Sequence, residues 1–150
     1  MKKLTHMDER GRARMVDIGR KKPTARTAIA AGKVFLGAQG RRAILDSKLP
    51  KGNPFEVARL AGIQAAKRTS RLIPLCHDLN LDFADVEIGL EEEGFHIRAE
   101  VRCRQATGVE MEALTAVAVS ALTLYDMCKA VDKEMVIGEV RLVEKRKGKN

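Results

Sequence analysis

The order of hydrophobic and polar positions along the chain predicts four strands. Residues 81–90 and 95–103 alternate between the two kinds of side chain, and the Glu93-Gly94 dipeptide between them suits a turn. These two stretches are therefore expected to form an antiparallel hairpin. Residues 135–143 have strand character near the end of the chain, and a run rich in Ala, Ile and Val over 26–36 predicts the first strand.

Two longer helices are expected between these strands, besides a short helix at 40–49. Asn53 can cap the first of them and Pro54 suits its first turn, so this helix is predicted from Pro54 to Leu72, before Pro74 stops it. Its apolar positions are expected to face the core. They are Val57, Leu60, Ala61, Ile63 and Ala65.

The second helix, from about Gly108 to Val131, has an unusual distribution of charge. No charged residue occurs between Glu112 and Asp126, whereas both ends are rich in charge, so the middle of the helix is predicted to be buried nearly all round. One sheet in so small a domain covers one side of a helix. A partner subunit is therefore expected to cover the rest, which predicts an oligomer.

This order of elements indicates an α+β fold, ferredoxin-like, in which helices pack on one face of an antiparallel sheet. The 150 residues suit a single domain, placed at 25–145. Residues 1–24 hold many Lys and Arg and few apolar side chains, which predicts a mobile basic arm. Residues 146–150 form a basic tail, and the stretch from Lys145 to Lys149 is expected to be frayed.

The composition narrows the class of protein. A net charge of +8 favours an anionic partner, which leaves a phosphorylated small molecule, a nucleic acid and an anionic lipid open. Aromatic residues make up only 3%, so stacking on bases is poorly provided for. Three cysteines without CxxC spacing argue against a disulfide framework or a four-ligand zinc site and fit the cytoplasm. The longest uncharged stretch, 113–125, is too short to cross a bilayer, so a soluble protein is expected.

The charged ends of the long helix are the first candidates for chemistry. Glu110 and Glu112 near its start are ordinary partners of the helix dipole in one interpretation and functional carboxylates in the other. Asp126 and Lys129 stand three residues apart, close enough to pair. An exposed ion pair is the simple interpretation, but a pair beside a buried stretch is expected to be desolvated, with pKa values moved toward the working pH.

Three loop residues are further candidates. Cys76 and His77 are adjacent, an arrangement that rarely chelates one metal ion or aligns a nucleophile with its base. His77 is better suited to bind a substrate or to move a proton. Lys51 beside Gly52 is either a solvated loop lysine or a phosphate contact, although no GxxxxGK[ST] motif accompanies it.

Longer strings of the sequence together resemble one family. They are Met15-Val16-Asp17-Ile18 with Thr24-Ala25-Arg26-Thr27-Ala28, then KGNPFEVARLAGIQAAKRTSRLIPLCH, and then GVEMEALTAVAVSALTLYDMCKAVDKEMVIGEVRL. By these strings, which span nearly everything after the first arm, the chain is similar to cyclic pyranopterin monophosphate synthase, the molybdenum cofactor biosynthesis protein C family. One departure is Asp78, where the family pattern usually has Pro, and it bears on the rigidity of that loop.

The resemblance implies a ferredoxin-like fold and a homohexamer, a trimer of dimers, with active sites at subunit interfaces. It implies a lyase that converts (8S)-3′,8-cyclo-7,8-dihydroguanosine 5′-triphosphate to cyclic pyranopterin monophosphate with release of pyrophosphate. No protein-bound cofactor or metal is expected, and whether Mg²⁺ accompanies the triphosphate stays open. Neither a membrane nor a nucleic acid is an expected partner.

The matched motifs also imply roles for single residues. Asp126 resembles the family's active-site acid, and Lys129 and Lys51 resemble its two catalytic lysines. The other matches are to substrate-binding positions, and they comprise Leu75, Cys76, His77, Met111, Glu112, Glu110, Lys67 and Arg26.

Two other classes of protein are weighed against this enzyme. A small basic nucleic-acid-binding protein would bind DNA or RNA with strong salt dependence. A catalytically idle scaffold would tolerate the loss of Lys51 and Asp126 together. If the enzyme interpretation holds, the two ends of the long helix are about 24 Å apart, too far to serve one small substrate, so a second chain is expected to complete each site.

Overall fold

The structure, a computed structural model, describes residues 6–8 and 10–148. Four antiparallel strands form one sheet in the order β2-β3-β1-β4. All four predicted strands are present, and the predicted hairpin is β2–β3. The bounds of the strands are β1 Thr24–Phe35, β2 Phe83–Glu91, β3 Gly94–Gln105 and β4 Val136–Lys147.

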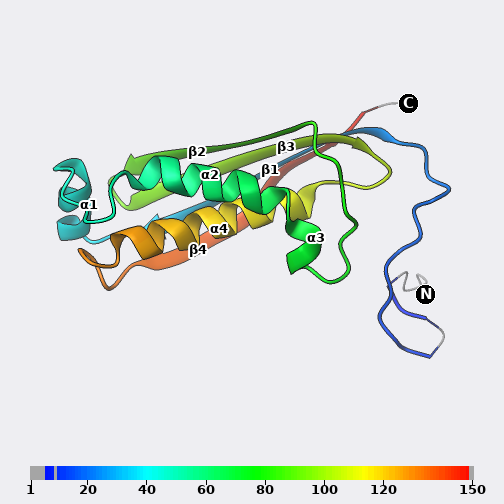
Figure 1. Cartoon of the computed structure of the whole chain (residues 1–150), viewed down its shortest axis with the longest axis horizontal. Helices are drawn as coiled ribbons and strands as arrows, with labels where there is room; N and C mark the ends of the chain where they lie inside the picture. The colour runs from blue at the N-terminus through cyan, green and yellow to red at the C-terminus, as the bar shows by residue number, and fades with distance from the viewer. Residues whose placement is uncertain (1–5, 9, 149–150) are drawn as a thin grey trace.

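The helices are α1 Ala38–Leu45, α2 Pro54–Ala66, α3 Thr69–Leu72 and α4 Glu110–Cys128. Figure 1 shows α2 and α4 side by side along one face of the sheet, with α1 near one end and α3 near the other. A helical segment follows β1 and another follows β3, and these two strands occupy the centre of the sheet. This arrangement confirms the predicted α+β, ferredoxin-like fold.

Small residues set the spacing between α4 and its neighbours. A Cβ atom at Gly62 of α2 would overlap Ser120 Oγ of α4, and one at Gly32 of β1 would lie 2.6 Å from Cγ1 of Val117. Ser120 also donates a hydrogen bond to the Ala58 carbonyl oxygen, 3.0 Å away. Because the packing is this close, α4 has no free space toward either α2 or the sheet.

The helix predicted over 54–72 is two helices. Thr69 Oγ1 donates hydrogen bonds to the carbonyl oxygens of Ala65 and Ala66, at 3.3 and 3.1 Å. Arg68 has φ −119° and ψ 11°, outside the α-helical region. The prediction is therefore wrong at Lys67 and Arg68, where the helix is interrupted, because a side-chain hydroxyl competes for the carbonyl oxygens that a continuous helix would use.

The buried face of α2 also differs from the prediction. Val57 is 47% exposed and Leu60 is 56% exposed, although both were expected to pack inward. The inner face approaches α4 so closely that it admits the smallest side chains instead of the largest. The buried residues of α2 are Pro54, Ala58, Gly62, Ala65 and Ala66.

The sequence predicted that the middle of α4 is buried nearly all round. In the single chain, one side of the helix stays exposed. Ten of its residues are buried, but Leu122 is 59% exposed and Met111 is 38% exposed. By length and composition α4 would also pass as a membrane span, but more than half of it is buried inside the fold, as in a core helix. With Val57 and Leu60, these residues give the helical layer apolar side chains that the described chain leaves partly exposed.

β4 is longer than the strand predicted at 135–143. It pairs with β1 as far as Lys147, opposite Arg26, and Gly148 N–H donates to the Ala25 carbonyl oxygen at 2.9 Å. The expectation of a frayed end is wrong up to residue 148, because backbone pairing tolerates charged side chains on an edge strand. Lys149 lies outside the described residues.

The N-terminal arm, seen in blue in Figure 1, extends beyond the end of the sheet before it enters β1. Its described residues before β1 contain no helix, and their one bridge is the isolated pair Met7 and Ala13. Arg12 Nε pairs with Asp8 at 2.8 Å. Among the described residues, the hydrogen bonds of the arm are therefore local except the one to His77, described below.

Candidate active site

One cluster of polar side chains lies at the C-terminal end of α4. Asp126 accepts hydrogen bonds from Lys51 Nζ at 2.6 Å and from Lys129 Nζ at 2.7 Å. Asn53 Oδ1 accepts a hydrogen bond from Phe55 N–H at 2.9 Å and so caps α2, as predicted. Lys51 lies two residues before this cap. The three residues matched to the family's catalytic positions are thus in contact within one chain.

The Asp126–Lys129 pair is not desolvated in this chain, in contrast to the prediction. Each of the two side chains is 55% exposed. Hydrogen bonds from Lys129 and Lys51 lower the pKa of Asp126 to about 2, and Asp126 raises the pKa of Lys129. Both pKa values move away from neutrality because opposite charges, and not burial, dominate here. Two ammonium groups around one carboxylate make the cluster suitable for an anion.

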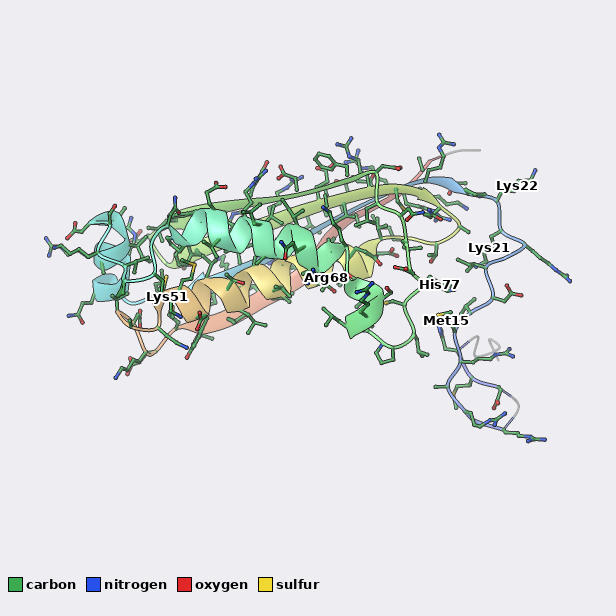
Figure 2. All side chains as sticks on the ribbon, in the orientation of Figure 1. Met15, Lys21, Lys22, Lys51, Arg68 and His77 are labelled. Carbon is green, nitrogen blue, oxygen red and sulfur yellow. The ribbon has the colours of Figure 1, made fainter. Side chains whose placement is uncertain are left out.

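A pocket of about 470 Å³ lies at the other end of α4. Figure 2 shows Lys51 near one end of α4 and His77 near the other. Glu112 in the pocket and Asp126 in the cluster are 14 positions apart, which corresponds to about 21 Å along the helix. The pocket brings together six of the predicted substrate-binding residues, namely Leu75, Cys76, His77, Glu110, Met111 and Glu112.

Glu110 and Glu112 have different surroundings in the first turn of α4. Glu112 is only 4% exposed, and burial raises its pKa to about 7. Glu110 forms an ion pair with Lys145 of β4. One member of the carboxylate pair is therefore a paired anion, and the other is a buried acid that changes protonation state near neutral pH.

Glu112 is expected to make the free energy of unfolding depend on pH. Its pKa is about 7 in the folded chain against 4.5 unfolded, so the folded chain binds this proton more tightly. The stabilisation is complete below about pH 4.5 and is lost as pH rises through 7, by up to about 3 kcal/mol. Urea unfolding at pH 5 and pH 8 should show a smaller loss in Glu112→Gln than in the wild type. Equal losses would contradict the raised pKa.

His77 is held by the N-terminal arm. Its Nε2 lies 2.8 Å from the Val16 carbonyl oxygen, which can only accept, so Nε2 carries the proton. In the neutral ring, Nδ1 is then an acceptor. Burial raises the pKa of the adjacent Cys76 thiol, which makes it a poor nucleophile. These features favour His77 as a substrate ligand or proton carrier over a Cys/His couple.

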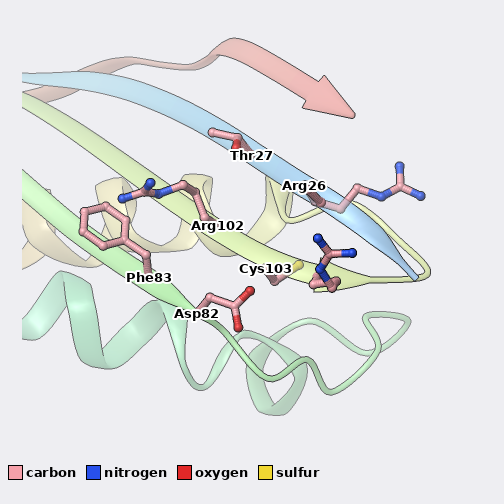
Figure 3. Close-up of a pocket in the computed structure, with 8 residues that line it drawn as sticks. Arg26, Thr27, Asp82, Phe83, Arg102 and Cys103 are labelled. Carbon is pink, nitrogen blue, oxygen red and sulfur yellow. The ribbon is translucent and has the colours of Figure 1, made fainter. Parts of the chain in front are cut away.

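Two of the predicted substrate-binding residues lie elsewhere in the chain. Lys67 is exposed at the C-terminal end of α2. Arg26 donates hydrogen bonds at 3.4 Å to the backbone carbonyl oxygens of residues 105–106 and lines another pocket, of about 410 Å³. Figure 3 shows this pocket, where the Arg102 guanidinium lies 3.9 Å from the centre of the Phe83 ring. Neither Lys67 nor Arg26 is among the residues that line the pocket of Glu112 in the single chain.

The 470 Å³ pocket also contains residues that the sequence alone did not single out. Their only signal was that some lie in the matched strings at 15–18 and from Gly108 onward. Nothing in the sequence relates the string at 15–18 to His77, 61 positions away from Val16. Within the described residues, no group of three or more His, Cys, Asp or Glu could hold a metal ion. The additional pocket residues are His6, Val16, Ile18, Lys21, Leu79, Thr107 and Gly108.

The fold and the site together define a class of protein: a ferredoxin-like α+β domain with a cationic cluster at one end of its central helix and a pocket around a buried acid at the other. A family model described as the MoaC family matches residues 15–148. This chain belongs to that family, which confirms the resemblance in the sequence.

Related proteins cover nearly the whole chain. The cyclic pyranopterin monophosphate synthase of Chloroflexus aurantiacus is 56% identical over 149 residues, which cover 98% of this chain and 91% of the relative. The protein of the same name from Pelotomaculum thermopropionicum is 56% identical over 152 residues, which cover 100% and 89%. The molybdenum cofactor biosynthesis bifunctional protein of Chlorobaculum tepidum is 51% identical over 147 residues, which cover 98% of this chain and 47% of that protein.

Proposed function

We propose that this protein is a lyase of molybdenum cofactor biosynthesis that converts (8S)-3′,8-cyclo-7,8-dihydroguanosine 5′-triphosphate to cyclic pyranopterin monophosphate with release of pyrophosphate. The observation that carries this proposal is membership of the MoaC family over residues 15–148, with relatives more than half identical that bear the synthase name. The contact of Lys51 and Lys129 with Asp126 adds a site of suitable charge.

In the proposed reaction, the cationic cluster carries out the chemistry. Opening and reclosing a purine-derived ring moves protons on and off nitrogen and oxygen atoms, which requires a positioned acid and base. Lys129 and Asp126, 2.7 Å apart, fill these roles once water is excluded from them. Lys51 donates to the triphosphate oxygens and stabilises the charge on the departing pyrophosphate.

The pocket at the start of α4 binds the guanine-derived rings in this proposal. Glu112, with a pKa of about 7, accepts a hydrogen bond from a ring N–H when ionised and donates one to a ring carbonyl when protonated. His77 contributes the acceptor Nδ1. Leu75 and Met111, each 38% exposed in the single chain, supply apolar surface for the rings.

Each active site in this proposal combines two chains of a homohexamer, a trimer of dimers. The roughly 21 Å between Glu112 and Asp126 exceeds the reach of one small substrate. Exposed apolar residues on the helical layer, such as Leu60 and Leu122, offer a surface for a second copy. Its approach would also enclose the exposed Asp126–Lys129 pair and bring Arg26 and Lys67 of another chain toward the triphosphate. The proposal includes a soluble, cytoplasmic enzyme without a protein-bound cofactor.

Incubating the purified protein with the cyclised guanosine triphosphate tests this proposal. Pyrophosphate and a cyclic phosphate product are expected in equal amounts. A folded protein that releases no pyrophosphate from this compound would remove the proposal. The nucleic-acid-binding alternative predicts instead salt-sensitive binding to duplexes or single strands, which the same preparation can be assayed for.

A further inference from the structure

One side of the pocket around Glu112 is built by the N-terminal arm. Among the pocket's lining residues, Val16, Ile18 and Lys21 come from this segment. The hydrogen bond of 2.8 Å from His77 Nε2 to the Val16 carbonyl oxygen ties the arm to the loop that carries the predicted substrate ligands. The arm therefore has a defined place against the pocket.

A turn in the arm presents Lys21 to the pocket. Asp17 Oδ1 accepts a hydrogen bond from Gly19 N–H at 2.8 Å, and Lys21 N–H donates to the Ile18 carbonyl oxygen at 2.9 Å. These two hydrogen bonds turn the chain between Asp17 and Lys21. Lys21 then lines the pocket, whereas its neighbour Lys22, further along the arm in Figure 2, is not one of the lining residues.

Lys21 is the one Lys or Arg that lines this pocket in the described part of the chain. The acids around it are Glu110, which is paired with Lys145, and the buried Glu112. Ionised carboxylates bind donor groups of a ligand, whereas the carbonyl of a guanine-derived ring and the oxygens of a phosphate are acceptors. Lys21 supplies a charged donor that these acids lack.

We infer that Lys21 contacts acceptor oxygens of the nucleotide-derived substrate and that residues 15–21 cover the occupied pocket. The inference rests on the proposed function and adds a binding residue to it. Because Lys21 lies at the pocket and not at the cluster of Lys51, Asp126 and Lys129, its loss weakens substrate binding and leaves the chemical step intact.

The variant Lys21→Ala is expected to raise KM for the cyclised guanosine triphosphate about tenfold, with kcat within about twofold of the wild type. Lys21→Arg keeps the cation and should recover most of the affinity. Lys22→Ala is the matched control, because it removes the same charge from the adjacent position. All three changes lie outside the core, so the variants should fold normally. Equal KM values for Lys21→Ala and Lys22→Ala would overturn the inference.

Binding of GTP separates this inference from the proposed function. GTP carries a guanine ring and a triphosphate, and calorimetry measures its Kd without turnover. The Kd is expected to rise about tenfold in Lys21→Ala and to stay unchanged in Lys22→Ala. A wild-type protein that binds GTP but releases no pyrophosphate from the cyclised nucleotide would refute the proposed function alone. An unchanged Kd in Lys21→Ala, or no GTP binding by the wild type, would overturn the role of Lys21.

Discussion

The variant Lys129→Ala is expected to lose roughly 10²- to 10⁴-fold in the rate of pyrophosphate release, with the loss in kcat. Lys129 Nζ lies 2.7 Å from Asp126, which holds it in one place, and this contact raises the pKa of Lys129 and keeps it an ammonium. In the proposed site, exclusion of water lowers that pKa again and makes the ammonium a proton donor. Without it, Asp126 keeps Lys51 as its partner and the anion site loses one of two cations. Steady-state kinetics with the cyclised guanosine triphosphate measures the effect.

Lys133→Ala is the matched control for this prediction. It removes the same charge one turn further along the chain, at another exposed position. Circular dichroism spectra and melting temperatures of both variants should match the wild type, because the side chain of Lys129 is more than half exposed and lies outside the core. Full turnover by a folded Lys129→Ala protein would show that the proposed proton-transfer role is wrong.

Mixed oligomers of two inactive variants are expected to recover roughly a quarter of the wild-type activity. Lys129→Ala disables the cluster at one end of α4, and Glu112→Gln disables the pocket at the other end. If each active site takes its cluster from one chain and its pocket from another, random association leaves one site in four with both parts intact. Coexpression of the two variants with different affinity tags, followed by purification through both tags, yields the mixed oligomers for assay.

A second mixture controls for unspecific recovery. Lys129→Ala combined with Asp126→Asn should stay inactive, because these two residues contact each other within one chain and every cluster would contain one defect. Recovery in this control, or no recovery in the first mixture, would contradict a site shared between chains. The contrast between the mixtures therefore tests the arrangement of the site separately from its chemistry.

The sheet and the long helices could be predicted because their signals are local. Alternation at 81–90 and 95–103 and the cap at Asn53 each depend on neighbours in sequence. The errors arise where distant parts meet. Close approach at Gly62 decides which face of α2 is buried, and the hydroxyl of Thr69 decides where that helix ends.

The site was predictable as a set of residues but not as an arrangement. The contact between Lys51 and Asp126 spans 75 positions, and only the fold brings the two side chains together. Burial raises the pKa of Glu112 to about 7, and no short sequence pattern specifies this burial. Asp126 was the acid expected to be desolvated, but its pKa is lowered. The sequence alone does not distinguish Lys21 from the other cations of the arm. The structure does, because Lys21 lines the pocket and Lys22 does not.

The close packing of α4 against the sheet and α2 limits which parts of this protein can move during turnover. The absence of a side chain at Gly32 and Gly62 lets α4 contact both the sheet and α2, so a sliding or tilting of this helix would cause clashes on two sides. Conformational change for substrate entry and product release must then come from the loop of Lys51, the loop of His77 and the arm. We therefore expect α4 to keep the Glu112 pocket and the Asp126 cluster at a constant separation, and the closing of these mobile segments to limit the rate of turnover.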